Sequence, residues 1–327
     1  MLLILLILVG IGIYGVATGQ LGTWSGIVRT WLDEPEPATS PPSDTTQNAT
    51  APSQGALVLK PMGPAELLAT RTPPRSLRLQ PGEFDRPPVE RFARPALFLG
   101  QKPRLAFVIV NLGHNTAVTA AAIADTPPEI TLSFSPYAPD LAAWIDAAHA
   151  FGHEVMLDLP LESRAYPQED PGPLGLVTAL NPEENARRLR ELLNLAEGTV
   201  GLATQRGDRF MTDADALKPV LAELGKNGYG FLATSGGENM LADAAKALEN
   251  PPPLARIGID IAHDLSRQAI ADKLTATFTL AQRERAALAV VQPYPLSIAA
   301  LTNLGAVAKD RGLALVPASA MFAKEAK

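Results

Sequence analysis

Four carboxylates lie at or close after the ends of apolar, strand-like segments, where they could act as acid and base. They are Asp158, Glu162, Asp208 and Asp260. Asp158 is the most distinctive, because it interrupts the apolar run VMLDLP beside Pro160. A carboxylate in such a position is hydrogen-bonded or has a perturbed pKa, and perturbed groups gather at functional sites. Two carboxylates in one cleft drive their pKa values apart, which permits acid–base hydrolysis.

A second set of residues at similar positions favours binding over proton transfer. It contains amides, a phenol, an imidazole and a guanidinium: Asn111, Tyr137, His153, Gln205, Arg209 and Gln292. Amides and hydroxyls form good hydrogen bonds but are poor ligands for a hard cation. Two members have alternative interpretations: His153 as a turn histidine bonded to the backbone, and Arg209 as a loop partner of Asp208.

Several kinds of chemistry are excluded or disfavoured by composition. The 327 residues contain no cysteine, which removes thiol catalysis, disulfides and cysteine-ligated metals. No pair of the four histidines has the spacing of a helical metal motif, and no Gly-x-Ser-x-Gly nucleophile elbow occurs. A net charge of −6 without a long basic run argues against nucleic acid as a partner.

The elements that must position these residues alternate between strand and helix patterns. Apolar strand-like runs are predicted at 105–110, 130–134, 154–159, 199–203, 230–233, 257–261, 287–291 and 313–316. Helical patterns lie between them, at 116–124, 141–150, 182–195, 213–227, 238–249, 267–284 and 296–311. This alternation predicts one parallel α/β domain, either an irregular barrel or a doubly wound sheet. In both folds the carboxyl ends of the strands form the site.

The first 101 residues are predicted to form three segments that precede the folded domain and connect it to a membrane. Residues 1–28 are apolar and long enough to cross a bilayer, so we expect a transmembrane anchor; a cleaved signal peptide and a buried helix are the alternatives. Residues 29–60 are rich in Pro, Ser and Thr and predict a disordered linker. Residues 61–101 predict a proline-rich arm, and residues 102–323 the folded domain.

Several stretches together resemble the divergent polysaccharide deacetylase family, which is related to the NodB-type carbohydrate esterases. They are PRLAFVIVNLG, ITLSFSPYAPDLAAWIDAAHAFGHEVMLDLPLES, YPQEDPGP, NPEENARRLRELL and RGDRF. The resemblance implies an irregular (β/α) barrel of the polysaccharide deacetylase type. It also implies a carbohydrate or cell-wall glycan as ligand. For the tethered chain it implies a single-pass protein of the bacterial inner membrane with its domain in the periplasm.

The resemblance also implies what has been lost. Metal-dependent members carry an Asp-Asp pair, an Asn-His, a later Asp and a Gly-His-Pro, which hold a divalent metal and activate water. Here those positions align with Val110-Asn111, Thr204-Gln205, Ala233 and Val291-Gln292-Pro293. We therefore predict that the family's zinc or similar metal is absent, with no cofactor in its place.

Three functions remain open from the sequence. The first is a membrane-tethered pseudoenzyme that binds carbohydrate. The second is a working hydrolase that uses the non-standard carboxylates Asp158, Glu162, Asp208 and Asp260. The third is an envelope interaction module for a cell-wall protein partner, for which a large exposed apolar patch away from the strand ends would be the signature.

Overall fold

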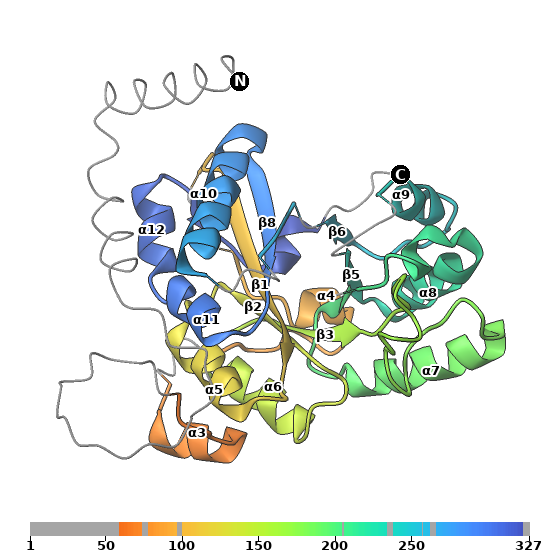
Figure 1. Cartoon of the computed structure of the whole chain (residues 1–327), viewed down its shortest axis with the longest axis horizontal. Coiled ribbons are helices and arrows are strands. Elements are labelled where there is room, and N and C mark those ends of the chain that lie inside the picture. Colours follow the sequence, from red (N-terminus) through yellow and green to blue (C-terminus); the bar gives the residue numbers. More distant parts are fainter. Residues whose placement is uncertain are drawn as a thin grey trace, which may run out of the picture.

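The computed structural model describes residues 59–73, 78–96, 100–204, 206–233, 238–256, 258–261 and 266–322. Its centre is a nine-stranded, all-parallel sheet in the order β6-β5-β4-β3-β2-β1-β8-β7, with β9 paired to β1 (Figure 1). The strands are β1 (Arg104–Leu112), β2 (Thr131–Phe134), β3 (Val155–Leu159), β4 (Gly201–Thr204), β5 (Gly230–Ala233), β6 (Leu254–Arg256), β7 (Ile259–Asp260), β8 (Ala286–Val291) and β9 (Ala314–Leu315).

The two edges of this sheet are joined by the chain itself. β6 pairs with β5 and β7 pairs with β8, although only two residues separate β6 from β7. Three Cα–Cα steps of about 3.8 Å connect Arg256 to Ile259, so the edges approach within about 11 Å. The α/β class is confirmed, and this parallel half-barrel is consistent with the predicted irregular (β/α) barrel. The strand predicted at 257–261 corresponds to the shorter β7, which pairs with β8, whereas β6 lies before the predicted run.

Helices cover the outside of the strands in two groups (Figure 1). The first group contains α5 (Thr116–Asp125), α6 (Leu141–Ala150), α10 (Arg267–Glu284), α11 (Pro295–Leu301) and α12 (Leu304–Asp310). The second contains α7 (Pro182–Leu195), α8 (Ala214–Asn227) and α9 (Glu238–Lys246). The helix predicted at 296–311 is thus two helices. The predicted start at Pro182 is confirmed, since the Asn181 side chain caps α7 by accepting from the Glu184 N–H at 2.7 Å.

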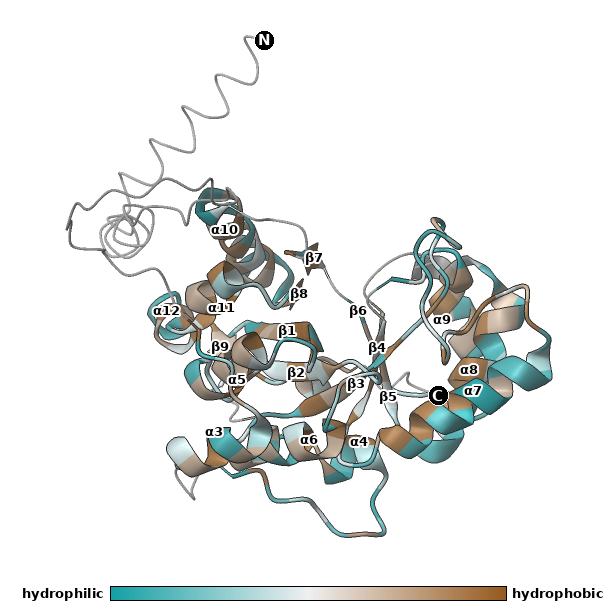
Figure 2. Ribbon diagram, turned by 60° about the horizontal axis from the view of Figure 1, so that its bottom comes forward, coloured by the Kyte–Doolittle hydropathy of each residue, from teal (hydrophilic) through white to brown (hydrophobic). Residues whose placement is uncertain are grey.

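Alternation along the strands separates an interior core from the outer ones. Figure 2 shows hydrophobic residues in the strands and a largely hydrophilic α7 outside them. In β1, Leu105, Phe107 and Ile109 pack against helices, whereas Ala106, Val108 and Val110 belong to a separate cluster with members from β8, β6 and β5. This cluster fills the space enclosed by the curved sheet. Residues 156 and 158 face it from β3 and residue 154 from directly before that strand, so Glu154 and Asp158 lie at its two ends.

The amino-terminal end of the interior is closed by segments far apart in the sequence. Glu154 is fully buried there, and its Oε1 accepts from the Thr131 hydroxyl and the Ser319 N–H, both at 3.0 Å. Oε2 accepts from the Arg94 N–H at 3.2 Å and from the Ser319 hydroxyl. The Thr131 hydroxyl oxygen accepts in turn from the Ala318 N–H at 2.8 Å. Burial raises the pKa of Glu154. One side chain therefore fastens both the segment before β1 and the C-terminal segment.

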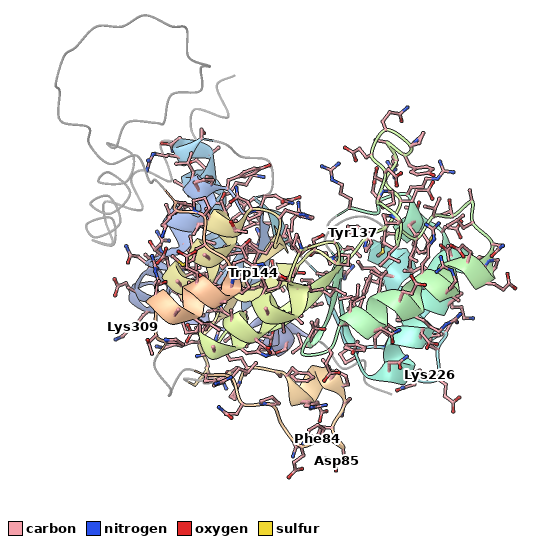
Figure 3. The ribbon with its side chains drawn as sticks, turned by 90° about the horizontal axis from the view of Figure 1, so that it is seen from below. Phe84, Asp85, Tyr137, Trp144, Lys226 and Lys309 are labelled. Atoms are coloured by element: carbon pink, nitrogen blue, oxygen red, sulfur yellow. The ribbon has the colours of Figure 1, made fainter. Side chains whose placement is uncertain are left out.

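The described residues of the segment before β1 (59–73, 78–96 and 100–103) pack against the domain. It contains α3 (Pro64–Thr70) and α4 (Pro88–Arg91) and buries Leu67, Leu79 and Phe92. Figure 3 shows Phe84 projecting from the body in the turn before α4, where its side chain is 88% exposed.

The predicted anchor (1–28) and nearly all of the predicted linker (29–60) lie outside the described residues. Among the helices that the structure does describe, none is both long enough and apolar enough to cross a bilayer.

Candidate functional site

A polar cavity of about 410 Å³ opens at the carboxyl ends of β1, β2 and β3. Asn111 and His114 line it after β1, Ser135 and Tyr137 after β2, and Asp158 near the end of β3. The remaining wall comes from the segment 159–171 and from Arg206 after β4. Its size lies within the range of small-molecule sites, and its place is the one that parallel α/β folds use for ligands.

An irregularity at the end of β1 places Asn111 in this cavity. The register between β1 and β2 shifts between Ile109 and Leu112, and Asn111 adopts a left-handed conformation with φ 62°. Asparagine tolerates this conformation better than most residues. Bulges of this kind turn a side chain away from the pleat and occur beside functional sites. Here the Asn111 side chain is exposed, and its backbone N–H donates to Asp158 Oδ2 at 2.9 Å.

Asp158 is held in a fixed orientation at the base of the cavity. Its side chain is 4% exposed, and Oδ1 accepts from the Ser133 hydroxyl at 2.6 Å while Oδ2 accepts from the Asn111 N–H. Ser133 lies in the adjacent strand β2 and Asn111 in β1, one strand further along the sheet, so the sheet itself sets the position of the carboxylate. The sequence prediction that a carboxylate inside this strand is hydrogen-bonded is confirmed.

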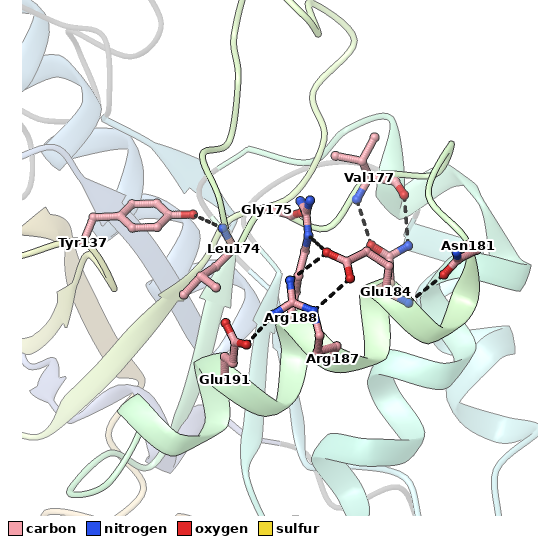
Figure 4. Close-up of polar contacts among 10 residues, drawn as sticks. Tyr137, Leu174, Gly175, Val177, Asn181, Glu184, Arg187, Arg188 and Glu191 are labelled. Atoms are coloured by element: carbon pink, nitrogen blue, oxygen red, sulfur yellow. Dashed lines mark hydrogen bonds and ion pairs between the residues drawn. The ribbon is translucent and has the colours of Figure 1, made fainter.

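Tyr137 supports the wall of the cavity formed by residues 163–175. Its hydroxyl donates to the Pro171 carbonyl at 2.9 Å. The same hydroxyl accepts from the Leu174 N–H at 3.1 Å, as Figure 4 shows. Burial raises the pKa of the Tyr137 phenol. Gly172 has φ 88°, and a Cβ there would lie 2.9 Å from the Tyr137 ring. The glycine therefore lets the wall approach the ring.

Replacing Gly172 with alanine should displace this wall and lower the free energy of unfolding by about 2–3 kcal/mol. Part of this cost is the positive φ and part is the contact with Tyr137. Gly312→Ala is a matched control, because Gly312 also has a positive φ, 69°, but nothing lies within 4 Å of its added Cβ. Urea unfolding of both variants measures the difference. Equal losses of unfolding free energy in the two variants would show that the contact between the added Cβ and Tyr137 does not destabilise the fold.

Helix α7 fixes the continuation of the wall from the other side (Figure 4). Arg188 donates to the Gly175 carbonyl at 2.6 Å, and the Asn185 amide pairs with the Val177 backbone at 3.1 and 2.9 Å. Hydrogen bonds from Arg187 and Arg188 lower the pKa of Glu184 to about 2. The wall is thus anchored at both ends, and these contacts fix the shape of the cavity.

Glu162, Arg209 and Asp208 lie beside the cavity without lining it. Glu162 is 2% exposed and accepts from the Thr178 N–H and hydroxyl at 2.7 and 2.6 Å, while Arg209 pairs with it at 3.0 Å. Asp208 accepts from the Arg164 N–H at 3.1 Å and pairs with its side chain at 3.3 Å. These three side chains connect loops to one another.

The remaining predicted residues are distributed more widely. His153 is 1% exposed, with its ring nitrogens 2.8 and 2.9 Å from the carbonyls of Ile130 and Ile123, as in its alternative interpretation. Burial lowers the pKa of His153. Asp260 pairs in register with Val290, which puts its side chain on the inner side of the sheet, but it is exposed there, and neither it nor Gln292 lines the cavity. Gln205 lies outside the described residues.

Several polar residues of the cavity were not selected as site residues from the sequence: His114, Ser135, Ser163, Gln168, Glu169, Asp170 and Arg206. His114 follows Asn111 by three residues, a spacing that could have marked it. Glu169 and Arg206 form an ion pair, and the Ser163 hydroxyl donates to Glu169 at 3.0 Å. No local pattern signals a pair separated by 37 positions, 169 to 206, because two loops of irregular structure bring it together.

A second groove lies between α7 and α8, with a volume of about 390 Å³. Leu189 and Val220 contribute apolar surface to it, and Arg190, Asp215 and Glu223 contribute charges. It is separate from the cavity at the strand ends, because the two share no lining residue.

The parallel half-barrel, with a cavity lined by many polar residues at its strand ends, defines an α/β protein whose cavity lies where such folds usually bind ligands. The chain belongs to the divergent polysaccharide deacetylase family, whose model matches residues 107–322. The family resemblance seen in the sequence is therefore confirmed.

Two solved structures are similar to the chain. An uncharacterized protein from Agrobacterium tumefaciens C58 is 31% identical, with a TM-score of 0.67, covering 75% of this chain and 99% of its own. A protein from Enterococcus faecalis V583 named for cellobiose-phosphate cleavage is 13% identical, with a TM-score of 0.44, covering 68% of this chain and all of its own. No curated protein matches the chain.

Proposed function

We propose that this chain binds carbohydrate at the cavity formed by the ends of β1, β2 and β3, without metal-dependent deacetylation. The observation that carries the proposal is the composition of that cavity. Asn111, Ser135 and Gln168 bring two amides and a hydroxyl to an open site of about 410 Å³, which the Tyr137 ring also lines. Such groups suit the many hydroxyls of a sugar ring, and family membership supports a carbohydrate as the ligand.

The donor set of the cavity does not fit the divalent metal that the wider family implies. Among the described residues, no three His, Asp or Glu side chains are grouped so that they could hold an ion. Glu169 is paired with Arg206, and the Asp158 oxygens accept from Ser133 and Asn111. A zinc site needs three or four convergent ligands. The carbohydrate binding that we propose therefore involves no metal ion.

The proposal includes the location of the domain. An apolar segment over residues 1–28 and a Pro-, Ser- and Thr-rich segment over residues 29–60 would tether it to the bacterial inner membrane on the periplasmic side. There the cavity would reach glycans of the cell envelope.

Calorimetric titration of the full chain with soluble oligosaccharides of glucosamine and N-acetylglucosamine should give saturable binding to one or both. Asn111→Gly should weaken this binding about fivefold to tenfold, since it removes the amide side chain and with it about 1 kcal/mol of hydrogen bonding. Glycine accepts the positive φ of this position, so the unfolding midpoint should change little.

Asn111→Ala removes the same amide but places alanine at positive φ, so it should lose stability as well as affinity. Binding that is the same in all three proteins would exclude this cavity as the site. Release of acetate without added metal, abolished by Asp158→Asn, would replace the binding function with hydrolysis by the non-standard carboxylates.

A further inference from the structure

Among the described residues, two of the exposed large hydrophobic side chains are tyrosines, and both follow the carboxyl ends of strands. Tyr166 is 38% exposed in the segment after β3, and Tyr294 is 39% exposed after β8. A tyrosine presents a flat apolar ring with a polar tip, which suits contact with a ligand that is itself partly apolar and partly polar. Both rings lie on the side of the sheet at which the cavity opens.

Tyr166 borders the cavity through the loop that carries it. Ser163 and Gln168, on either side of it in the sequence, both line the cavity. The Tyr166 N–H donates to the Ser163 carbonyl at 3.1 Å, and the Glu169 N–H donates to the Ala165 carbonyl at 3.1 Å. These turns hold the backbone around Tyr166 in the cavity wall. The exposed ring therefore stands at the rim, next to the lining but not part of it.

Tyr294 lies on the other side of the cavity. It follows β8, which pairs with β1 on the side away from β2. Ile109 of β1 pairs with Val291 of β8, so Asn111 and Tyr294 follow paired positions by two and three residues. The Tyr294 backbone is fixed by its N–H, which donates to the Gln292 carbonyl at 2.9 Å. The strands that lead to the two tyrosines, β3 and β8, are three strand spacings or about 14 Å apart across the sheet.

We propose that the cavity is the centre of a longer binding face for a carbohydrate chain, on which Tyr166 and Tyr294 each pack against a sugar ring beside the one in the cavity. This inference rests on the carbohydrate-binding function proposed above. A pyranose ring with equatorial hydroxyls exposes C–H groups on both faces, which pack on an aromatic ring while the hydroxyls stay in water. One sugar ring cannot span about 14 Å, whereas a chain of several can. The face thus selects oligosaccharides over single sugars.

Calorimetric titration of the full chain with the monosaccharides and the β-1,4-linked tetrasaccharides of glucosamine and N-acetylglucosamine tests this dependence on length. In the series that binds, the tetrasaccharide should bind about twentyfold more tightly or better, because only it reaches a tyrosine as well as the cavity. Equal affinities for the two lengths would overturn the extended face while leaving carbohydrate binding at the cavity intact. Binding of none of the four ligands would overturn the binding function as well.

Tyr166→Ala and Tyr294→Ala should each lower the affinity for the tetrasaccharide about fivefold to tenfold and change that for the monosaccharide by less than about twofold. Both side chains are exposed, so the unfolding midpoints should stay close to that of the native chain. Phe84→Ala is the matched control, because it removes a ring that is 88% exposed and that Figure 3 shows well away from Tyr137. This variant should bind the tetrasaccharide as the native chain does.

Tyr166→Phe and Tyr294→Phe separate the ring from its hydroxyl. Each keeps the aromatic surface, so each should bind the tetrasaccharide within about twofold of the native chain. A loss in the phenylalanine variants equal to that in the alanine variants would assign the effect to the hydroxyls and overturn the packing of sugar on the rings. Unchanged affinity in both alanine variants would exclude the tyrosines from the binding face.

Discussion

Replacing Glu154 with glutamine should lower the free energy of unfolding by about 2–3 kcal/mol, one of the largest effects expected of a single-atom change in this chain. Each oxygen of Glu154 accepts from a backbone N–H, Oε1 from Ser319 and Oε2 from Arg94. Whichever way a glutamine amide is turned, its NH₂ group faces one of these buried donors. That donor is then left without an acceptor, and the segment it fastens is released from the barrel.

Asp158→Asn is the matched control for this prediction, because it makes the same carboxylate-to-amide change in β3, close to Glu154 in the sequence. Only one oxygen of Asp158 accepts from the backbone in the hydrogen bonds described above; the other accepts from a hydroxyl, which can rotate to accept instead. Its unfolding free energy should fall by less than about 1 kcal/mol. Urea unfolding at neutral pH compares the two variants. Similar losses of unfolding free energy in the two variants would show that the number of backbone N–H donors does not determine the destabilisation.

These two carboxylates also show what the sequence reveals and what it conceals. Asp158 is recognisable because it interrupts an apolar run, and the structure places it at the cavity. Glu154 stands in the same strand pattern but carries no comparable signal, since its partners Arg94 and Ser319 are 60 and 165 residues away. Periodicity identifies the face of a strand, but long-range hydrogen bonds depend on the tertiary fold.

The sequence likewise predicted part of the candidate site. Strand ends gave Asn111, Tyr137 and Asp158, which do line one cavity, because parallel strands bring their carboxyl ends together. Glu162 and Asp208 follow strands equally closely, yet the loops turn them toward Thr178 and Arg164. Loop conformation after a strand is set by contacts such as those of Tyr137 with Pro171 and Leu174, which no local pattern contains.

The domain should lose stability in mild acid because His149 is buried in its neutral form. This side chain is 9% exposed, and its ring is stacked on Phe92 with the centroids 6.0 Å apart. Its buried Nε2 has no hydrogen-bond partner among the described residues. Burial lowers the pKa of His149 from 6.5 to about 4, although Asp146 and the Gly198 carbonyl oppose the shift.

The sign of the effect follows from proton binding. Between pH 6.5 and about 4 the unfolded chain binds a proton at His149 that the folded chain does not, so stability falls as the pH is lowered through this range. One pKa unit corresponds to about 1.4 kcal/mol, so the full contribution of His149 is roughly 3 kcal/mol. It is complete above pH 6.5 and lost near pH 4.

His149→Phe should remove this pH dependence while keeping an aromatic ring against Phe92. Near pH 7.5 the stability of the variant should be within about 1 kcal/mol of that of the native chain, because the ring contact with Phe92 is kept. Near pH 4 the variant should be the more stable of the two. Urea unfolding of both proteins across this range gives the difference, in which contributions common to both, such as that of His153, cancel. Parallel stability curves would show that the ring of His149 is protonated as readily in the folded chain as in the unfolded one.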